Sequence, residues 1–198
     1  MNLKPAATAA VLLAAVSCFV ALAPWVPGPA NVFALIVSQG AQNMGFTISS
    51  ASFPNGGDIP RKFTCDGADT SPQLSWSQPP AGIHSLALIA NDPDAPVGDW
   101  THWVVFDLPA SLSALPEGLD KTGEIPGGGR QGVNDFHKIG YGGPCPPPGK
   151  PHRYFFRIYA LDRTLGLKAG SSREDVEAAM KGHILGQAEW MGKYKRGN

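Results

Sequence analysis

The sequence has little charge and no excess of either sign. Its 198 residues include 16 Lys and Arg and 16 Asp and Glu, which gives a formal net charge of +0 at pH 7. Without a basic surplus, there is no electrostatic case for nucleic acid or an anionic membrane surface as the main partner. We therefore expect no nucleic-acid partner, and we expect instead a small ligand, with a protein target as a further option.

The sequence also lacks the motifs that mark common catalytic sites. It contains no Gly-x-Ser-x-Gly nucleophile elbow and no His-Glu-x-x-His metal motif, and Gly149-Lys150 is followed by Pro151, which rules out a phosphate-cradling P-loop. We therefore expect a protein that is not an enzyme and that needs no cofactor and no metal. Two alternatives stay open: a hydrolase that uses Asp92 and His102, and a metal site built from two histidines and an aspartate.

Long apolar runs are scarce, with one exception at the N-terminus. Lys4 precedes an apolar stretch over residues 6–23, the pattern of a secretory signal. Val32-Phe33-Ala34 has the small-residue spacing of a cleavage site. An uncleaved membrane anchor and lipid attachment at Cys18 are the alternatives. The pattern predicts export to the periplasm or secretion.

Cysteine is scarce, and its use agrees with export. We interpret residues 1–34 as the signal peptide, 35–44 as a linker and 45–198 as a single domain. Of the 3 cysteines, Cys65 and Cys145 would remain after processing, both within loop sequences. An even pair in an oxidising compartment makes a disulfide bond between them an open hypothesis, because sequence alone does not give their separation.

Glycine and proline are abundant, at 24 and 19 residues, which favours a β protein with many loops over a helical bundle. One helix is expected after the N-capping residues Ser171 and Ser172, with Val176 and Met180 at helical spacing and a stop at Gly182. Polarity patterns predict strands near residues 46–48, 74–76, 85–91, 101–108, 153–161 and 184–194. The expected architecture is mainly β, either a sandwich or a mixed sheet, with a helix near the C-terminus.

Two histidines stand at the starts of predicted strands, each after a loop rich in proline and glycine. His102 alternates with Val104, and His152 alternates with Tyr154, so each histidine is in phase with apolar neighbours on its strand. This phasing predicts that the two imidazoles converge at one end of the sheet. The alternative is a pair of unrelated histidines in the core.

Other polar groups lie close to these histidines in sequence. Asp92 can hold an imidazole in one tautomer, or it can start a turn before Pro93. Tyr154 offers a hydroxyl, and Tyr141 precedes Gly142-Gly143, where backbone amides can approach a ligand. Together these groups suit a phosphate monoester or diester. Because histidines gain charge below about pH 6.5, anion binding should strengthen as pH falls.

The same segments carry several multi-residue motifs in a fixed order. They are Asp92-Pro93-Asp94-Ala95-Pro96, Trp100-Thr101-His102-Trp103, Gly140-Tyr141-Gly142-Gly143-Pro144-Cys145-Pro146-Pro147 and His152-Arg153-Tyr154. This set resembles the phosphatidylethanolamine-binding protein family, and specifically its bacterial Raf-kinase-inhibitor-like branch. The resemblance covers residues 46–196.

The resemblance implies a β-sandwich built on a large antiparallel sheet, with a short C-terminal helix and a small pocket for phosphate-bearing head groups. Its pocket positions fall on Asp92, His102, His152 and Tyr154, with Gly143 and Pro144 as the wall. It also implies that bacterial relatives often carry glycine where this chain has His137. The expected ligand is a phosphate-bearing small molecule or a phospholipid head group, with regulation of a partner protein, inhibition of a kinase or protease, and homodimerisation as further options.

Overall fold

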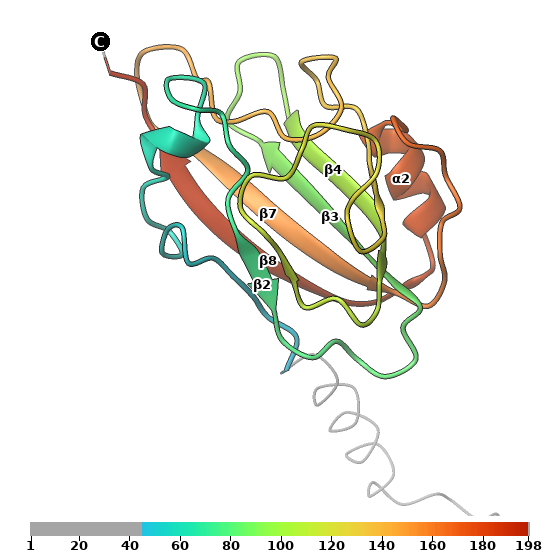
Figure 1. The fold of residues 1–198 in the computed structure, drawn as a ribbon. Coiled ribbons are helices and arrows are strands. Elements are labelled where there is room, and N and C mark those ends of the chain that lie inside the picture. The colour runs from blue at the N-terminus through green and yellow to red at the C-terminus, as the bar shows by residue number, and fades with distance from the viewer. Residues whose placement is uncertain (1–44, 198) are drawn as a thin grey trace, which may run out of the picture.

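A computed structural model describes residues 45–197 of the chain (Figure 1). The predictions of a signal peptide, a cleavage site, a membrane anchor, lipid attachment at Cys18 and a linker all fall on residues 1–44, outside the described residues. Within the described part, no helix has the length and apolar character needed to cross a membrane.

A five-stranded antiparallel sheet forms the body of the domain. Its strands lie in the order β6-β4-β3-β7-β8, and the four long strands β4, β3, β7 and β8 run side by side in Figure 1. The strand bounds are Ser85–Asp92 for β3, Trp100–Pro109 for β4, Arg130–Gln131 for β6, His152–Leu161 for β7 and Ile184–Tyr194 for β8.

A smaller antiparallel sheet covers one face of the large one, and a helix covers the other. The small sheet has the order β1-β2-β5, and β2 crosses in front of the large sheet in Figure 1. Its strands are Ile48–Ser49 for β1, Leu74–Trp76 for β2 and Ala114–Leu115 for β5, with a 3-10 turn η1 at Arg61–Phe63. The helix α2, Arg173–Met180, lies beside β4.

The apolar run in β3 is explained by burial on both faces. Leu86 and Leu88 belong to the core between the two sheets, whereas Ala87 and Ile89 belong to a second core under α2. Successive side chains of a strand point to opposite faces, so a strand between two cores is apolar throughout. This layered, mainly β architecture with a short C-terminal helix confirms the predicted fold class.

Helix α2 begins and ends where the sequence predicts. The Ser172 hydroxyl accepts from the Asp175 amide at 3.2 Å, and the Asp175 carboxylate accepts from the Ser172 amide at 3.1 Å, which completes a reciprocal capping box. Two residues after Met180 the chain reaches Gly182, whose φ of +82° suits glycine and ends the helix. The helix then buries Val176 and Met180 against the large sheet.

Candidate functional site

A pocket of about 150 Å³ opens at the end of the large sheet where β3 ends and where β4 and β7 begin. Both predicted histidines and the predicted aspartate line it, so the three groups do meet at one end of the sheet. The full lining consists of Asp92, Ala95, Pro96, Val97, Trp100, His102, Phe136, Cys145, Pro146, Pro147 and His152.

His102 reaches this pocket because of an irregularity in β4, and the predicted strand phase of His102 is wrong. Ala90 pairs with Trp103 while the next residue, Asn91, pairs with Thr101, which leaves His102 as the extra residue of a β-bulge. In a regular strand His102 would share the face of Val104, which lies in the core under α2. The bulge re-aims the side chain toward the other face. The imidazoles therefore converge, but through a bulge and not through strand periodicity.

The surroundings of His102 fix its neutral tautomer. Its Nδ1 lies 2.6 Å from the carbonyl oxygen of Gly142, and a carbonyl only accepts, so Nδ1–H must donate. The ring is 4% exposed and packs edge-on against Tyr154 and Phe136, with centroid distances of 5.1 and 5.4 Å. Burial lowers the pKa of His102, although the Gly142 hydrogen bond and the Asp92 carboxylate oppose the shift. The ring is thus neutral near pH 7, with Nε2 as an acceptor.

Asp92 performs both of the roles that its sequence position allows. Its Oδ2 lies 2.8 Å from His152 Nδ1, and its Oδ1 accepts from the Asp94 amide at 2.8 Å, which closes a turn. The side chains of His152 and Asp92 are 11% and 4% exposed, so this pair lies almost out of solvent. The carboxylate holds Nδ1 of His152 and leaves Nε2 as the ring nitrogen available to a ligand.

Tyr154 lies beneath the pocket and not in its lining. The residue is 2% exposed and contacts the His102 ring, and its hydroxyl has no hydrogen-bond partner of normal geometry among the described residues. Burial and the nearby Asp92 carboxylate raise the pKa of Tyr154, so the hydroxyl keeps its proton. The indole Nε1–H of Trp100, a pocket residue, is a second buried donor that has no partner within residues 45–197.

Tyr141, Gly143 and Pro144 were predicted to bind the ligand, but the structure places all three outside this pocket. The Tyr141 hydroxyl donates to the Phe63 carbonyl at 2.8 Å, and its ring packs in the core. The Gly143 amide donates to Asp69 Oδ1 at 2.6 Å, so it cannot serve a ligand in the pocket. Glycine is required at this position because a Cβ would lie 2.4 Å from the Phe63 carbonyl oxygen.

The same loop does supply the pocket wall, two to four residues after Gly143. Cys145, Pro146 and Pro147 line the pocket, and Cys145 is joined to Cys65 by a disulfide bond with a Cα–Cα distance of 5.4 Å. The bond closes a sequence separation of 80 residues, and the Cys65 amide also donates to the Pro144 carbonyl at 3.1 Å. The wall is therefore tied covalently to the η1 region.

Sequence reasoning missed Trp100 and Phe136 as pocket residues. It also missed how residues 95–98, which form the rim loop of the pocket, are held in place. Asp94 forms a bidentate ion pair with Arg153, with contacts of 2.7 and 2.8 Å, and this pair lowers the pKa of Asp94 to about 2. Trp100 stands two residues before His102 in the motif Trp100-Thr101-His102-Trp103, so the sequence could have identified it as a pocket residue. Phe136 lies in a long loop with no local signal.

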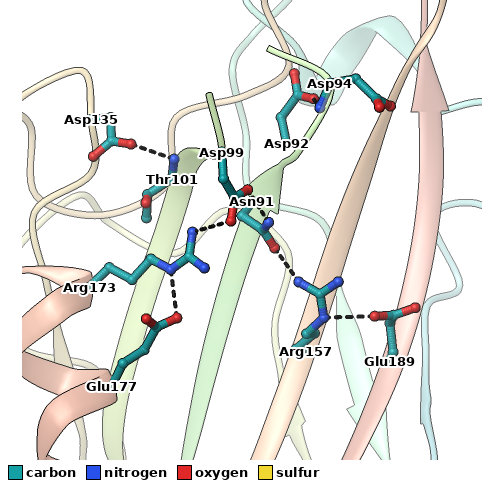
Figure 2. A network of polar contacts seen from close by, with 10 residues as sticks. All are labelled: Asn91, Asp92, Asp94, Asp99, Thr101, Asp135, Arg157, Arg173, Glu177 and Glu189. Atoms are coloured by element: carbon teal, nitrogen blue, oxygen red, sulfur yellow. Dashed lines mark hydrogen bonds and ion pairs between the residues drawn. The ribbon is translucent and has the colours of Figure 1, made fainter. Parts of the chain in front are cut away.

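A chain of polar contacts fixes the other end of the rim loop, at Asp99 (Figure 2). Buried Asn91 accepts from Arg157 at 2.6 Å and donates to Asp99, which accepts from Arg173 of α2 at 2.7 Å. The two arginines also pair with acidic residues on β8 and α2, namely Glu189 and Glu177. Because Asp94 and Asp99 flank residues 95–98, the apolar rim of the pocket is anchored on both sides.

Metal ligation was the alternative use of two histidines and an aspartate. Within residues 45–197, no group of three or more His, Cys, Asp or Glu side chains is arranged to hold a metal ion. In the pocket, the Asp92 oxygens are both engaged in hydrogen bonds to protein groups.

Comparison with known proteins gives a consistent match over nearly the whole described region. The family model described as phosphatidylethanolamine-binding protein matches residues 49–195. A UPF0098 protein of Methanothermobacter thermautotrophicus is 51% identical over 76% of this chain and 99% of its own length. One from Aquifex aeolicus is 52% identical over 75% of this chain and 88% of its own length.

Two solved structures are also similar. One is described as a homologue of phosphatidylethanolamine-binding protein from Chlamydia trachomatis, with 40% identity, a TM-score of 0.71 and coverage of 77% of this chain and 99% of that one. The other is E. coli YbcL, described as a member of the mammalian family of the same kind, with 33% identity and the same TM-score and coverage.

Proposed function

This chain belongs to the phosphatidylethanolamine-binding protein family, and from that premise we propose that its pocket binds phosphate-bearing small molecules or phospholipid head groups without catalysing a reaction. The observation that carries the proposal is a pocket lined by two histidines, each with Nδ1 held by a protein acceptor and Nε2 left for a ligand, beside the buried Trp100 Nε1–H, which has no partner among residues 45–197. A buried donor left unpaired costs about 1–3 kcal/mol. An oxyanion supplies the acceptors that would recover this free energy.

The two histidines make binding dependent on protonation. With Nδ1 of each ring held by a protein acceptor, Nε2 is an acceptor in the neutral ring and a donor in the protonated one. A phosphate oxygen without a proton therefore favours the protonated rings, whereas a P–OH group can donate to a neutral ring. Burial lowers the pKa of His102, so this ring must take up a proton before its Nε2 can donate to a deprotonated phosphate oxygen. Affinity should consequently rise as pH falls.

A binding role fits the pocket better than hydrolysis through Asp92 and His102. Both Asp92 oxygens accept hydrogen bonds from the protein, and His102 Nδ1 is held by a backbone carbonyl. The pocket lining contains no serine, threonine or lysine, and its cysteine is in the disulfide bond. No activated nucleophile is therefore at hand for a covalent step.

The setting of this function is also a proposal. The N-terminal apolar segment supports export to the periplasm or secretion, where the disulfide bond would persist.

Val97 is 77% exposed at the pocket rim, and its neighbours there are proline and alanine, which suits the apolar part of a lipid beside its head group.

The test is a calorimetric or NMR titration with phosphoethanolamine at pH 6.0. Wild type should bind, and His102→Ala and His152→Ala should each weaken binding by about tenfold or more, the scale of a lost hydrogen bond to a charged group. His183→Ala is the matched control, because His183 also pairs with an aspartate but lies at the far end of the sheet. Unchanged affinity in both pocket variants would show that the site is wrong, and release of inorganic phosphate would show that binding is not the whole activity.

A further inference from the structure

A second hollow of about 200 Å³ lies directly beside the pocket. Phe136 and Cys145 line both spaces, so the two hollows share a wall. Phe136 is 36% exposed and packs edge-on against Trp100 and His102, with centroid distances of 5.3 and 5.4 Å. It forms a low apolar ridge, over which a ligand anchored in the pocket can extend into the second hollow.

The second hollow has one cation in excess. Its Asp69 carboxylate is already neutralised by Lys121, and its Oδ1 accepts from the Gly143 amide. Lys138, the other lysine of the lining, forms no ion pair with any residue from 45 to 197. The net charge of the lining is therefore positive, and the charge that remains uncompensated is the Lys138 ammonium group.

Lys138 projects from a rigid turn. Its backbone amide donates to Asn134 Oδ1 at 3.2 Å, and its carbonyl accepts from the Asn134 amide at 2.9 Å. Asn134 also accepts from the Phe136 amide at 3.0 Å, so one side chain fixes both the ridge and the lysine. The backbone that presents the ammonium group is thus ordered before a ligand arrives, which reduces the entropy lost on binding.

We propose that this hollow is a second anion subsite, and that the preferred ligand class is a phosphate monoester carrying a carboxylate or second phosphate several bonds away. The inference rests on the proposed function, since the phosphate must occupy the first pocket. Lys138 then acts as a specificity-determining residue that selects for the distal anionic group.

Binding of a matched pair of ligands to the full chain tests this inference. 6-Phosphogluconate and sorbitol 6-phosphate share the phosphate and the six-carbon chain, and only the former has a carboxylate at the far end. Wild type should bind 6-phosphogluconate about two to five times more tightly in low salt, the range of an exposed ion pair. The preference should shrink as ionic strength rises.

Variants separate this outcome from failure of the proposed function. Lys138→Ala should bind the two ligands equally, with its affinity for sorbitol 6-phosphate unchanged, while Lys181→Ala, the same charge change after α2, should keep the wild-type preference. Equal affinities in wild type, or a preference that survives in Lys138→Ala, would overturn the second subsite and leave the first pocket intact. If neither sugar phosphate nor phosphoethanolamine binds, the proposed function fails and the second subsite fails with it.

Discussion

The large sheet carries a histidine–aspartate pair at each end of β7, and the two pairs have the same contact in different surroundings. At one end His152 Nδ1 lies 2.8 Å from Asp92, and at the other His183 Nδ1 lies 2.8 Å from Asp162. The first pair has side chains 11% and 4% exposed, whereas the second has side chains 33% and 41% exposed.

The second pair borders a wide hollow of about 580 Å³ that also contains Arg163, whose Nη1 lies 3.4 Å from His183 Nε2. By charge alone the Arg163 end would suit an anion better than the pocket. Yet solvent reaches the groups at this end freely, so an anion that binds there gains contacts little stronger than the contacts with water that it gives up. The pocket end instead has its histidine–aspartate pair almost out of solvent, beside the buried Trp100 Nε1–H, which has no partner among residues 45–197. Burial of the polar groups, more than the count of positive charges, separates the proposed binding pocket from the polar surface at the other end.

The largest expected difference between the two ends comes from removing each aspartate. Asp92→Ala leaves the His152 ring and the Asp94 amide without their acceptor in a buried setting, and should lower the free energy of unfolding by about 2–4 kcal/mol. Asp162→Ala removes an exposed partner and should cost less than about 1 kcal/mol. Urea unfolding at pH 7.5 measures both.

Phosphoethanolamine titration of the same two variants sharpens the contrast. Asp92→Ala should lose binding because His152 is no longer held in one tautomer, whereas Asp162→Ala should bind as wild type does. Equal losses of stability in the two variants would mean that burial does not distinguish the pairs.

The pH dependence of stability is the next largest effect, and it should arise at the pocket end from His102. An unfolded chain protonates histidine near pH 6.5, but burial lowers the pKa of His102 in the folded chain. Below pH 6.5 the unfolded state therefore binds a proton that folded His102 does not, and stability falls with pH until the lowered pKa is reached. Above pH 6.5 the residue contributes no slope.

Between pH 6.5 and 5.5 this contribution has an upper limit of about 1 kcal/mol of unfolding free energy, which is reached when folded His102 takes up no proton in the interval. His102→Asn keeps a donor for the Gly142 carbonyl but does not titrate, so its stability should fall less than that of wild type over this interval, by a difference of up to about 1 kcal/mol. Chemical unfolding at pH 7.5, 6.5 and 5.5 gives both curves. Parallel curves would exclude a lowered pKa for His102.

Long elements could be predicted from the sequence because their periodicity reports burial. The continuous apolar run of β3 and the alternation in β7 follow directly from which faces are covered. The two-residue strands β5 and β6 were not predicted, since two residues carry no period and their pairing depends on β2 and β4.

The site was predicted in part, and the failures have one cause. Asp92, His102 and His152 meet as expected, but the side that His102 faces depends on a bulge that strand parity does not reveal. Gly143 was assigned to a ligand because its motif exposes an amide, yet that amide is held by Asp69, 74 residues away. Partners distant in sequence decide which groups of a loop stay free, and local motifs contain no record of them.

The smallest expected effect concerns His137, which lies at the pocket end but lines neither the pocket nor the second hollow. Its φ of +59° is in the left-handed region, which favours glycine. The strain of a side chain there is about 1–2 kcal/mol, and the added backbone entropy of glycine in the unfolded chain is about 0.5–1 kcal/mol. His137→Gly should therefore raise the free energy of unfolding by about 0.5 kcal/mol and leave phosphoethanolamine binding unchanged.

Gly140→Ala is the reverse control, because its φ is +89° and its Cβ would lie 3.0 Å from Lys121 Cα, so it should be clearly destabilised. A less stable His137→Gly variant would mean that the imidazole contributes a contact worth more than the strain, and that the pocket end depends on a third histidine.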